Sequence, residues 1–313
     1  MKNKKINLIK YIKNSNINDI KENILYYFYN DKLCENNIGS GYYGEIIKPN
    51  ISKYMKIKTL LKTKIKVPIV VKKFKNNYKE IINISILDNI LYIYGISLFF
   101  EILILLYIKK LWLKKKSIHL PLIIGYGTCN NEILLITEKH GLKELKNGYD
   151  KKIITLYDFL NYIILFYDEK TLNIKLPNNI ECNIIKLLDY ISISYIHTCK
   201  ILYENNIYIT DLHYNNIFIH ELNKYSYIDN ININNLKEIY YKNNNDILKI
   251  ETYGYIIKLG DVGDFNIKPR DDIIIISGIS NIENYKYINF QNGYGILDII
   301  YNYMVLLPYN IFK

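Results

Sequence analysis

One apolar run constrains the fold more than any other segment. It extends from Ile90 to Ile108 and is broken only by Gly95, Ser97 and Glu101. A run of this length and composition predicts a helix that either crosses a membrane or lies in a protein core. A carboxylate near the centre of a bilayer costs about 2 to 4 kcal/mol, and the run has little length to spare. We therefore expect a buried helix whose carboxylate, Glu101, faces a functional site, and no transmembrane span.

The composition is that of a globular protein. The chain has 313 residues, of which 50% are apolar, enough to bury a sizeable core. Its formal charge of +11 would suggest an acidic partner such as nucleic acid. However, Lys, Asn, Ile and Tyr all have codons rich in A and T, and Lys is spread along the whole chain. We therefore expect no specific binding of nucleic acid.

The cysteines and the N-terminus favour a cytoplasmic protein. The chain has 4 Cys, far apart and without a Cys-x-x-Cys pair, which indicates neither a zinc site nor a disulfide framework. The charged N-terminus is not followed by an apolar segment of signal-peptide length. Reduced thiols and a cytoplasmic location are the expectation.

Residue patterns predict strands in the first third of the chain and helices later. Alternating and β-branched runs favour strands, and apolar residues at three- and four-residue steps favour helices. The expected strands are 37–48, 67–74, 118–126, 132–138 and 253–259, and the expected helices are 155–166, 180–204 and 296–306. The segment 49–66 is Lys-rich and the segment 223–245 is Asn-rich, so both are interpreted as irregular insertions.

A glycine-rich segment precedes the first β-branched run. Residues 38–46 read Ile-Gly-Ser-Gly-Tyr-Tyr-Gly-Glu-Ile, in which glycines allow the backbone to approach phosphates without a Cβ clash. A dinucleotide-binding turn needs a helix directly afterwards, and none is indicated here. A hairpin over nucleotide phosphates is therefore favoured, with a purely structural turn as the alternative. The candidate nucleotide-binding residues are Gly39, Ser40, Gly41, Gly44 and Ile46.

Lys72 and Glu101 are each unusual for their surroundings. Lys72 ends a β-branched run, where its ammonium group could reach nucleotide phosphates, although a lysine there can also simply mark a strand end. Glu101 lies within the apolar run and needs a cation to offset its burial. We expect these two residues to pair. Glu80 is the second-ranked partner for Lys72, since its surroundings are more polar.

Two further segments carry carboxylates in patterns typical of phosphoryl transfer. Residues 210–219 contain Asp211 and, five residues later, Asn216, so a carboxylate that can accept a hydroxyl proton precedes an amide that can hold magnesium. Residues 260–263 read Gly-Asp-Val-Gly after a strand, which makes Asp261 a candidate magnesium ligand. Each pattern alone is also compatible with an ordinary polar turn, and Asp264 competes with Asp261.

The ordered set of these motifs resembles the protein-kinase fold, from about Asn36 to about Leu306. The resemblance implies an α+β, bilobal protein. It would comprise an N-terminal extension at 1–35, a β-rich N-lobe at 36–140, and a mainly helical C-lobe at 141–313 whose last helices are missing or shortened. Residues 120–129, residues 252–258 and the Asn-rich insertion are similar to segments of the serine/threonine kinases of poxviruses and other large DNA viruses.

The resemblance assigns roles to individual residues. Asp211 would be the catalytic base, Asn216 and Asp261 the magnesium ligands, Lys72 the phosphate anchor and Glu101 its partner. Thr137 would be the gatekeeper beside the adenine pocket, and the backbone from Glu138 to His140 would contact adenine. Asp298 would be the buried carboxylate that holds the catalytic loop in place.

Three departures leave the substrate open. Ile-Thr precedes Asp211 where protein kinases have His-Arg, which predicts activity independent of activation-loop phosphorylation. His213 stands two residues after the base, where protein kinases usually have a lysine. The resulting pattern Asp-x-His-x-x-Asn is also seen in aminoglycoside- and choline-type kinases. An Ala-Pro-Glu sequence is absent after Asp261, which puts the surfaces that dock peptide substrates in doubt.

The expected activity is ATP- and Mg²⁺-dependent phosphorylation of Ser and Thr in proteins, with Mn²⁺ as a substitute metal. For a poxvirus-type enzyme, the substrates would be virion or membrane proteins in the host cytoplasm or the virion, which is compatible with peripheral contact with a membrane. The alternatives are a small-molecule kinase of the same fold and a pseudokinase scaffold.

Overall fold

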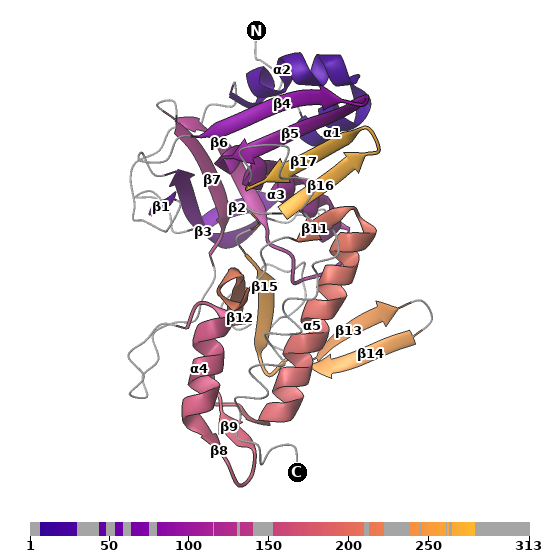
Figure 1. Cartoon of the computed structure of the whole chain (residues 1–313). Coiled ribbons are helices and arrows are strands. Elements are labelled where there is room, and N and C mark those ends of the chain that lie inside the picture. The colour runs from indigo at the N-terminus through magenta and orange to yellow at the C-terminus, as the bar shows by residue number, and fades with distance from the viewer. Residues whose placement is uncertain are drawn as a thin grey trace.

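The computed structural model describes residues 7–29, 44–47, 54–58, 64–74, 80–114, 116–129, 132–139, 153–209, 213–221, 238–243, 246–260, 262 and 265–278. These residues form five α-helices, a short 3₁₀ helix and several sheets, all but one of whose strand pairs are antiparallel (Figure 1). The α+β class predicted from the sequence is confirmed.

The strand that carries Lys72, β3, pairs with three other strands of the first sheet. The strand order of this sheet is β1–β3–β7–β6, and β2 pairs with the other half of β3. The strands are β1 (Gly44–Ile47), β2 (Tyr54–Lys58), β3 (Lys64–Phe74), β6 (Ile123–Cys129) and β7 (Glu132–Glu138). The expectation that 49–66 is irregular is wrong for β2 and the start of β3. Their pairing runs through backbone groups, which a Lys-rich sequence supplies as well as any other.

The second sheet joins segments that are far apart in the sequence. Its order is β11–β16–β17–β5–β4, and β17 runs parallel to β5. The strands are β4 (Ile81–Leu87), β5 (Ile90–Ile96), β11 (Ile207–Ile209), β16 (Phe265–Arg270) and β17 (Ile273–Ser277). The strand that follows the predicted magnesium ligand thus lies beside the hairpin that precedes the central helix.

The apolar run from Ile90 is therefore a strand before it is a helix, which corrects the sequence-based prediction. Asp88 and Asn89 have φ of 50° and 61°, as in a two-residue hairpin turn, and this turn makes β5 the return strand of β4. At Gly95, with φ of 153°, a Cβ would lie 1.9 Å from the carbonyl oxygen of Ile81. The Ser97 hydroxyl then accepts the N–H of Phe99 (3.1 Å) and begins α3 (Leu98–Leu113).

Helix α3 is the centre of the core, because it is apolar on nearly all sides. The N-terminal helices α1 (Leu8–Asn14) and α2 (Ile17–Tyr29) cover one side of it (Figure 1). The ring of Phe28 packs edge-on against Phe99, with ring centres 4.7 Å apart, and stacks on Tyr126 at 5.8 Å. The predicted N-terminal extension is therefore, over the part described, an integral layer of the fold.

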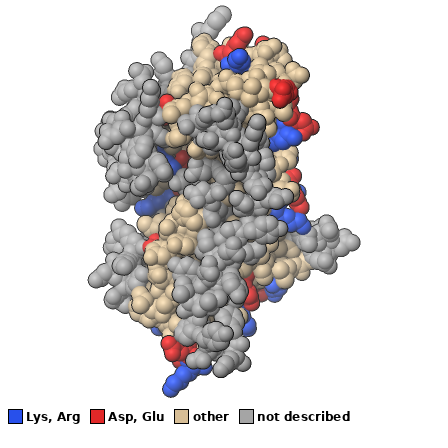
Figure 2. Space-filling view, viewed as in Figure 1, with Lys and Arg blue, Asp and Glu red and all other residues tan. Residues whose placement is uncertain are grey.

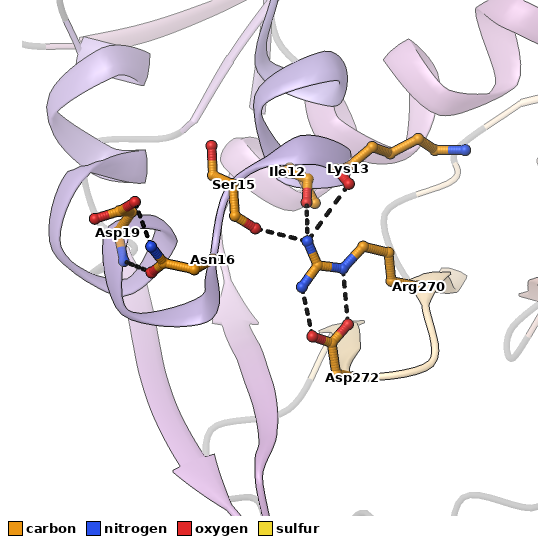
Figure 3. A network of polar contacts seen from close by, with 7 residues as sticks. All are labelled: Ile12, Lys13, Ser15, Asn16, Asp19, Arg270 and Asp272. Atoms are coloured by element: carbon orange, nitrogen blue, oxygen red, sulfur yellow. Dashed lines mark hydrogen bonds and ion pairs between the residues drawn. The ribbon is translucent and has the colours of Figure 1, made fainter.

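Arg270 connects this layer to the second sheet. Its Nη1 donates to the carbonyl oxygen of Ser15 (2.6 Å) and lies near those of Ile12 and Lys13 (3.5 and 3.4 Å), at the C-terminal end of α1. Its Nε and Nη2 form a fork with the carboxylate of Asp272 (Figure 3). The turn between β16 and β17 is thereby tied to the N-terminal helices.

The remaining elements lie around the long helix α5 (Figure 1). They are α4 (Leu156–Phe166), β8 (Tyr167–Asp168), β9 (Asn173–Lys175), β10 (Glu181–Asn183), α5 (Ile184–Glu204), η1 (Tyr214–Asn216), β12 (Ile217–Glu221), β13 (Glu238–Asn243), β14 (Asp246–Glu251) and β15 (Tyr255–Leu259). The prediction that the chain after 141 is mainly helical is wrong for its described residues, which hold two α-helices and ten strands. Residues 238–243 also form a strand, paired with β14, rather than an irregular insertion.

Two properties of the described residues bear on possible partners: the apolar character of the helices and the distribution of surface charge. Within the described ranges, no helix is both long and apolar enough to cross a membrane. On the face shown in Figure 2, the blue and red side chains of these ranges are interspersed over the surface. No extended basic patch is seen among the described residues of this face.

Candidate active site

Lys72 and Glu101 form an ion pair, as the sequence indicated. Nζ of Lys72 lies 2.7 Å from Oε2 of Glu101, and their side chains are 24% and 9% exposed. The pair joins the middle strand of the first sheet to the central helix. For Glu80, the rival partner, burial raises the pKa of the carboxyl group, and Ser97 opposes this shift in part. The side chain of Lys72 thus remains partly exposed to solvent on the face of the sheet that meets α3.

The strand register places further candidates around Lys72. Lys72 pairs with Leu135, and Val70 pairs with Thr137, so Val70, Lys72 and Thr137 lie on one face of the sheet. On the other side of β3, Ile46 is the residue directly opposite Lys72, and Gly44 is opposite Phe74. Residues assigned to the phosphate anchor and the gatekeeper thus share one surface.

Two antiparallel ladders bracket the segments that carry the other candidates. In the first, β11 pairs with β16, and Ile209 is opposite Phe265. In the second, β12 pairs with β15, and Ile217 is opposite Leu259. The connections 210–216 and 260–264 therefore both run from one ladder to the other. The described residues that flank the two connections, Ile209 and Phe265 at one end and Ile217 and Leu259 at the other, are thus paired.

Asn216 stands where these two connections meet. Its carbonyl oxygen accepts the N–H of Gly260 at 2.7 Å. A Cβ at Gly260 would lie 1.7 Å from a ring carbon of Phe218, so glycine is needed for this approach. Asn216 ends η1, whose first turn is capped by His213, since Nδ1 of His213 accepts the N–H of Asn215 at 3.2 Å. The His213 ring has a structural role in this loop, whatever the substrate.

The sequence predicts that the backbone of Glu138 contacts adenine, but the structure shows that its N–H group is already bonded within the protein. Its N–H donates to the carbonyl oxygen of Leu122 at 3.2 Å and is thus committed within the protein. Its carboxylate is fully buried and contacts Lys258 of β15 through both oxygens, at 2.7 and 2.8 Å. The sequence reasoning missed this pair. The available signal was a lysine in the middle of the apolar strand 255–259, which requires a buried anion.

Several predicted site residues lie outside the described part of the chain. They are Gly39, Ser40, Gly41, His140, Asp211, Asp261 and Asp298, together with Asp264. Of Gly44 and Ile46, the structure describes the strand pairing but not the side chains. The residues that it brings together are Lys72, Glu101 and Thr137 around the first sheet, and Asn216 beside Gly260.

The chain was compared with protein-family models and with curated proteins. Neither comparison finds a match. We therefore argue the roles of the site residues from their geometry and chemistry.

Proposed function

We propose that this protein is an ATP- and magnesium-dependent protein kinase that phosphorylates Ser and Thr hydroxyls. The observation that carries the proposal is the Lys72–Glu101 ion pair between a sheet and the central helix. A lysine held by a carboxylate presents a fixed cation for nucleotide phosphates, and phosphoryl transfer depends mainly on such positioning and charge neutralisation. The partly exposed side chain of Lys72 is suited to that role.

The topology around Asn216 supports the same proposal. In the sequence, Asp211 is two residues beyond the paired residue Ile209, and Asp261 is two residues beyond the paired residue Leu259. Asn216 and Asp261 would hold Mg²⁺ through oxygen atoms, the ligand type this ion prefers. Bound Mg²⁺ would neutralise charge on the β- and γ-phosphates.

Asp211 would orient the acceptor hydroxyl and receive its proton. The hydroxyl oxygen forms a bond to the γ-phosphorus as the bond to the bridging oxygen breaks, and ADP departs with the electron pair. In a bilobal arrangement, the first sheet and α3 would form one lobe and the elements around α5 the other. Virion or membrane proteins of a large DNA virus, phosphorylated in the host cytoplasm, are the proposed substrates.

A transfer assay with the purified chain tests this function. Wild type and Asp211→Asn are incubated with magnesium and ATP labelled in the γ-phosphate, with casein, a basic protein or small hydroxyl compounds as acceptors. We expect labelled phosphoserine and phosphothreonine, and a roughly 100-fold to 10,000-fold lower rate for Asp211→Asn. Equal labelling by both proteins would remove the assignment of the base. Labelling confined to small molecules would favour a small-molecule kinase, and an inert wild type a pseudokinase.

A further inference from the structure

The structure contains a second Lys–Glu pair that phosphate binding does not use. Glu138 ends β7 and Lys258 lies in β15, and neither side chain has any exposure to solvent. Nζ of Lys258 is 2.7 and 2.8 Å from the two carboxylate oxygens. Burial of two opposite charges is costly unless their contacts are close and directional, so such a pair requires an explanation.

The carboxylate of Glu138 is also held by the backbone. Oε1 accepts the N–H of Leu122 at 3.0 Å, while the N–H of Glu138 donates to the carbonyl oxygen of Leu122 at 3.2 Å. Both ends of residue 138 are thus fixed to the segment that precedes β6. Apolar side chains can slide past one another, whereas these contacts specify one position of β7 relative to β15.

The segment before β6 in turn holds β15. The N–H of Leu259 donates to the carbonyl oxygen of His119 at 2.9 Å, and Nδ1 of His119 is 2.7 Å from the carbonyl oxygen of Ile257. A carbonyl group can only accept, so Nδ1 carries the proton and Nε2 accepts from the hydroxyl of Tyr241 at 2.7 Å. Lys258 therefore lies in a stretch of β15 that is fixed on both sides.

The pair lies between two parts of the proposed active site. Glu138 directly follows Thr137, the residue assigned beside the adenine pocket. Lys258 precedes Asp261, the proposed magnesium ligand, by three residues, and Gly260 between them contacts Asn216. A change in the distance between β7 and β15 would change the distance between the adenine and the metal.

We infer that Glu138 and Lys258 are positioning residues that set the adenine-binding end of β7 at a fixed distance from the magnesium-binding end of β15. This inference rests on the proposed function and adds to it a device for aligning the nucleotide. Neither residue touches the reacting atoms. Their effect reaches catalysis through the geometry of bound ATP, where a misplacement of about 1 Å can cost about 100-fold in rate.

The test compares four proteins. They are the wild type, the double variant Lys258→Met/Glu138→Leu, the single variant Glu138→Gln, and the control Lys249→Met/Glu238→Gln. The double variant removes both charges and so leaves no unpaired ion in the core. The control removes a pair of the same length, 2.7 Å, whose side chains are 54% and 38% exposed. For the folded protein, kcat, KM for ATP, KM for casein and the magnesium concentration for half-maximal rate are measured.

We expect kcat/KM for ATP to fall about 10-fold to 100-fold in the double variant. The magnesium requirement should rise, while KM for casein should stay unchanged. Glu138→Gln should show a smaller fall in the same direction, and the control should match wild type. If the double variant does not fold, Glu138→Gln decides the question, since an amide oxygen of the same size can still accept from Lys258 and from the N–H of Leu122.

Two results would overturn the inference while leaving the proposed function intact. One is wild-type kcat/KM for ATP and magnesium requirement in the folded variants. The other is activity that falls only in proportion to the unfolded fraction, without a change in KM for ATP, which is the result of a purely structural role. A wild-type protein that transfers no phosphoryl group would instead remove the proposed function and this inference with it.

Discussion

Two of the Lys–Glu pairs in the described part of this protein, Lys72–Glu101 and Lys258–Glu138, have the same length but differ in their exposure to solvent. Lys72–Glu101 and Lys258–Glu138 both measure 2.7 Å from nitrogen to oxygen. The first pair has side chains that are 24% and 9% exposed, whereas both side chains of the second are completely buried. Solvent access, rather than bond length, separates a lysine that can meet a ligand from one that can only hold the fold in place.

The largest expected effect comes from breaking the buried pair. Lys258→Met leaves the carboxylate of Glu138 without its cation, which should lower the free energy of unfolding by about 3–5 kcal/mol. Lys72→Met should lower it by less, about 1–3 kcal/mol, because solvent reaches the side chain of Lys72 although Glu101 is largely buried. Urea denaturation followed by circular dichroism measures both values. Equal losses in the two variants would mean that exposure does not distinguish the pairs.

A second expected effect is the pH dependence of the buried network. Burial lowers the pKa of His119 to about 3, against an ordinary value of 6.5. The unfolded chain therefore binds more protons than the folded one between these values, and stability is lost as the pH falls below 6.5. This residue should account for about 2 kcal/mol of lost stability between pH 7 and pH 5.

The variant His119→Asn isolates this contribution, since other groups also titrate in the range. Wild type and variant are unfolded in urea at pH 7, 6 and 5, and the difference between their unfolding free energies is followed. This difference in unfolding free energy should become smaller as the pH falls, because only the wild type loses the contribution of His119. A difference that stays constant over this range would show that His119 is not buried in its neutral form.

The smallest effect is expected at the most exposed of these three pairs. The side chains of Arg270 and Asp272 are 26% and 42% exposed, and Arg270 also binds the carbonyl oxygens at the end of α1. Arg270→Ala should cost about 1 kcal/mol of stability, since solvent replaces part of these contacts. Lys268→Ala, two residues earlier in β16, serves as the control. A loss as large as that of Lys258→Met would place Arg270 with the buried pair.

The sequence was sufficient for the Lys72–Glu101 pair, because each residue was unusual in its context. A carboxylate in an apolar run needs a cation, and a lysine at the end of a β-branched run can supply one. The same reasoning applied to Lys258 in the apolar strand 255–259 would have required a buried anion. It would not have identified Glu138, because the two residues meet only through the packing of β7 against β15.

The boundary between β5 and α3 shows what residue pattern alone could not provide. An unbroken apolar run is compatible with a buried strand as well as a buried helix. What decides it is local: the turn at Asp88 and Asn89, the backbone at Gly95 and the cap at Ser97. The parallel pairing of β5 with β17 depends on a segment more than half the length of the chain away, and no local pattern encodes it.

The most direct test of the central claim is phosphoryl transfer by Lys72→Met, with Lys249→Met as the matched surface control. Both variants and wild type are brought to equal concentrations of folded protein and supplied with magnesium, labelled ATP and casein. We expect labelled casein with wild type and the control, and a roughly 100-fold to 1,000-fold lower rate with Lys72→Met. Transfer by Lys72→Met at the wild-type rate would contradict this claim.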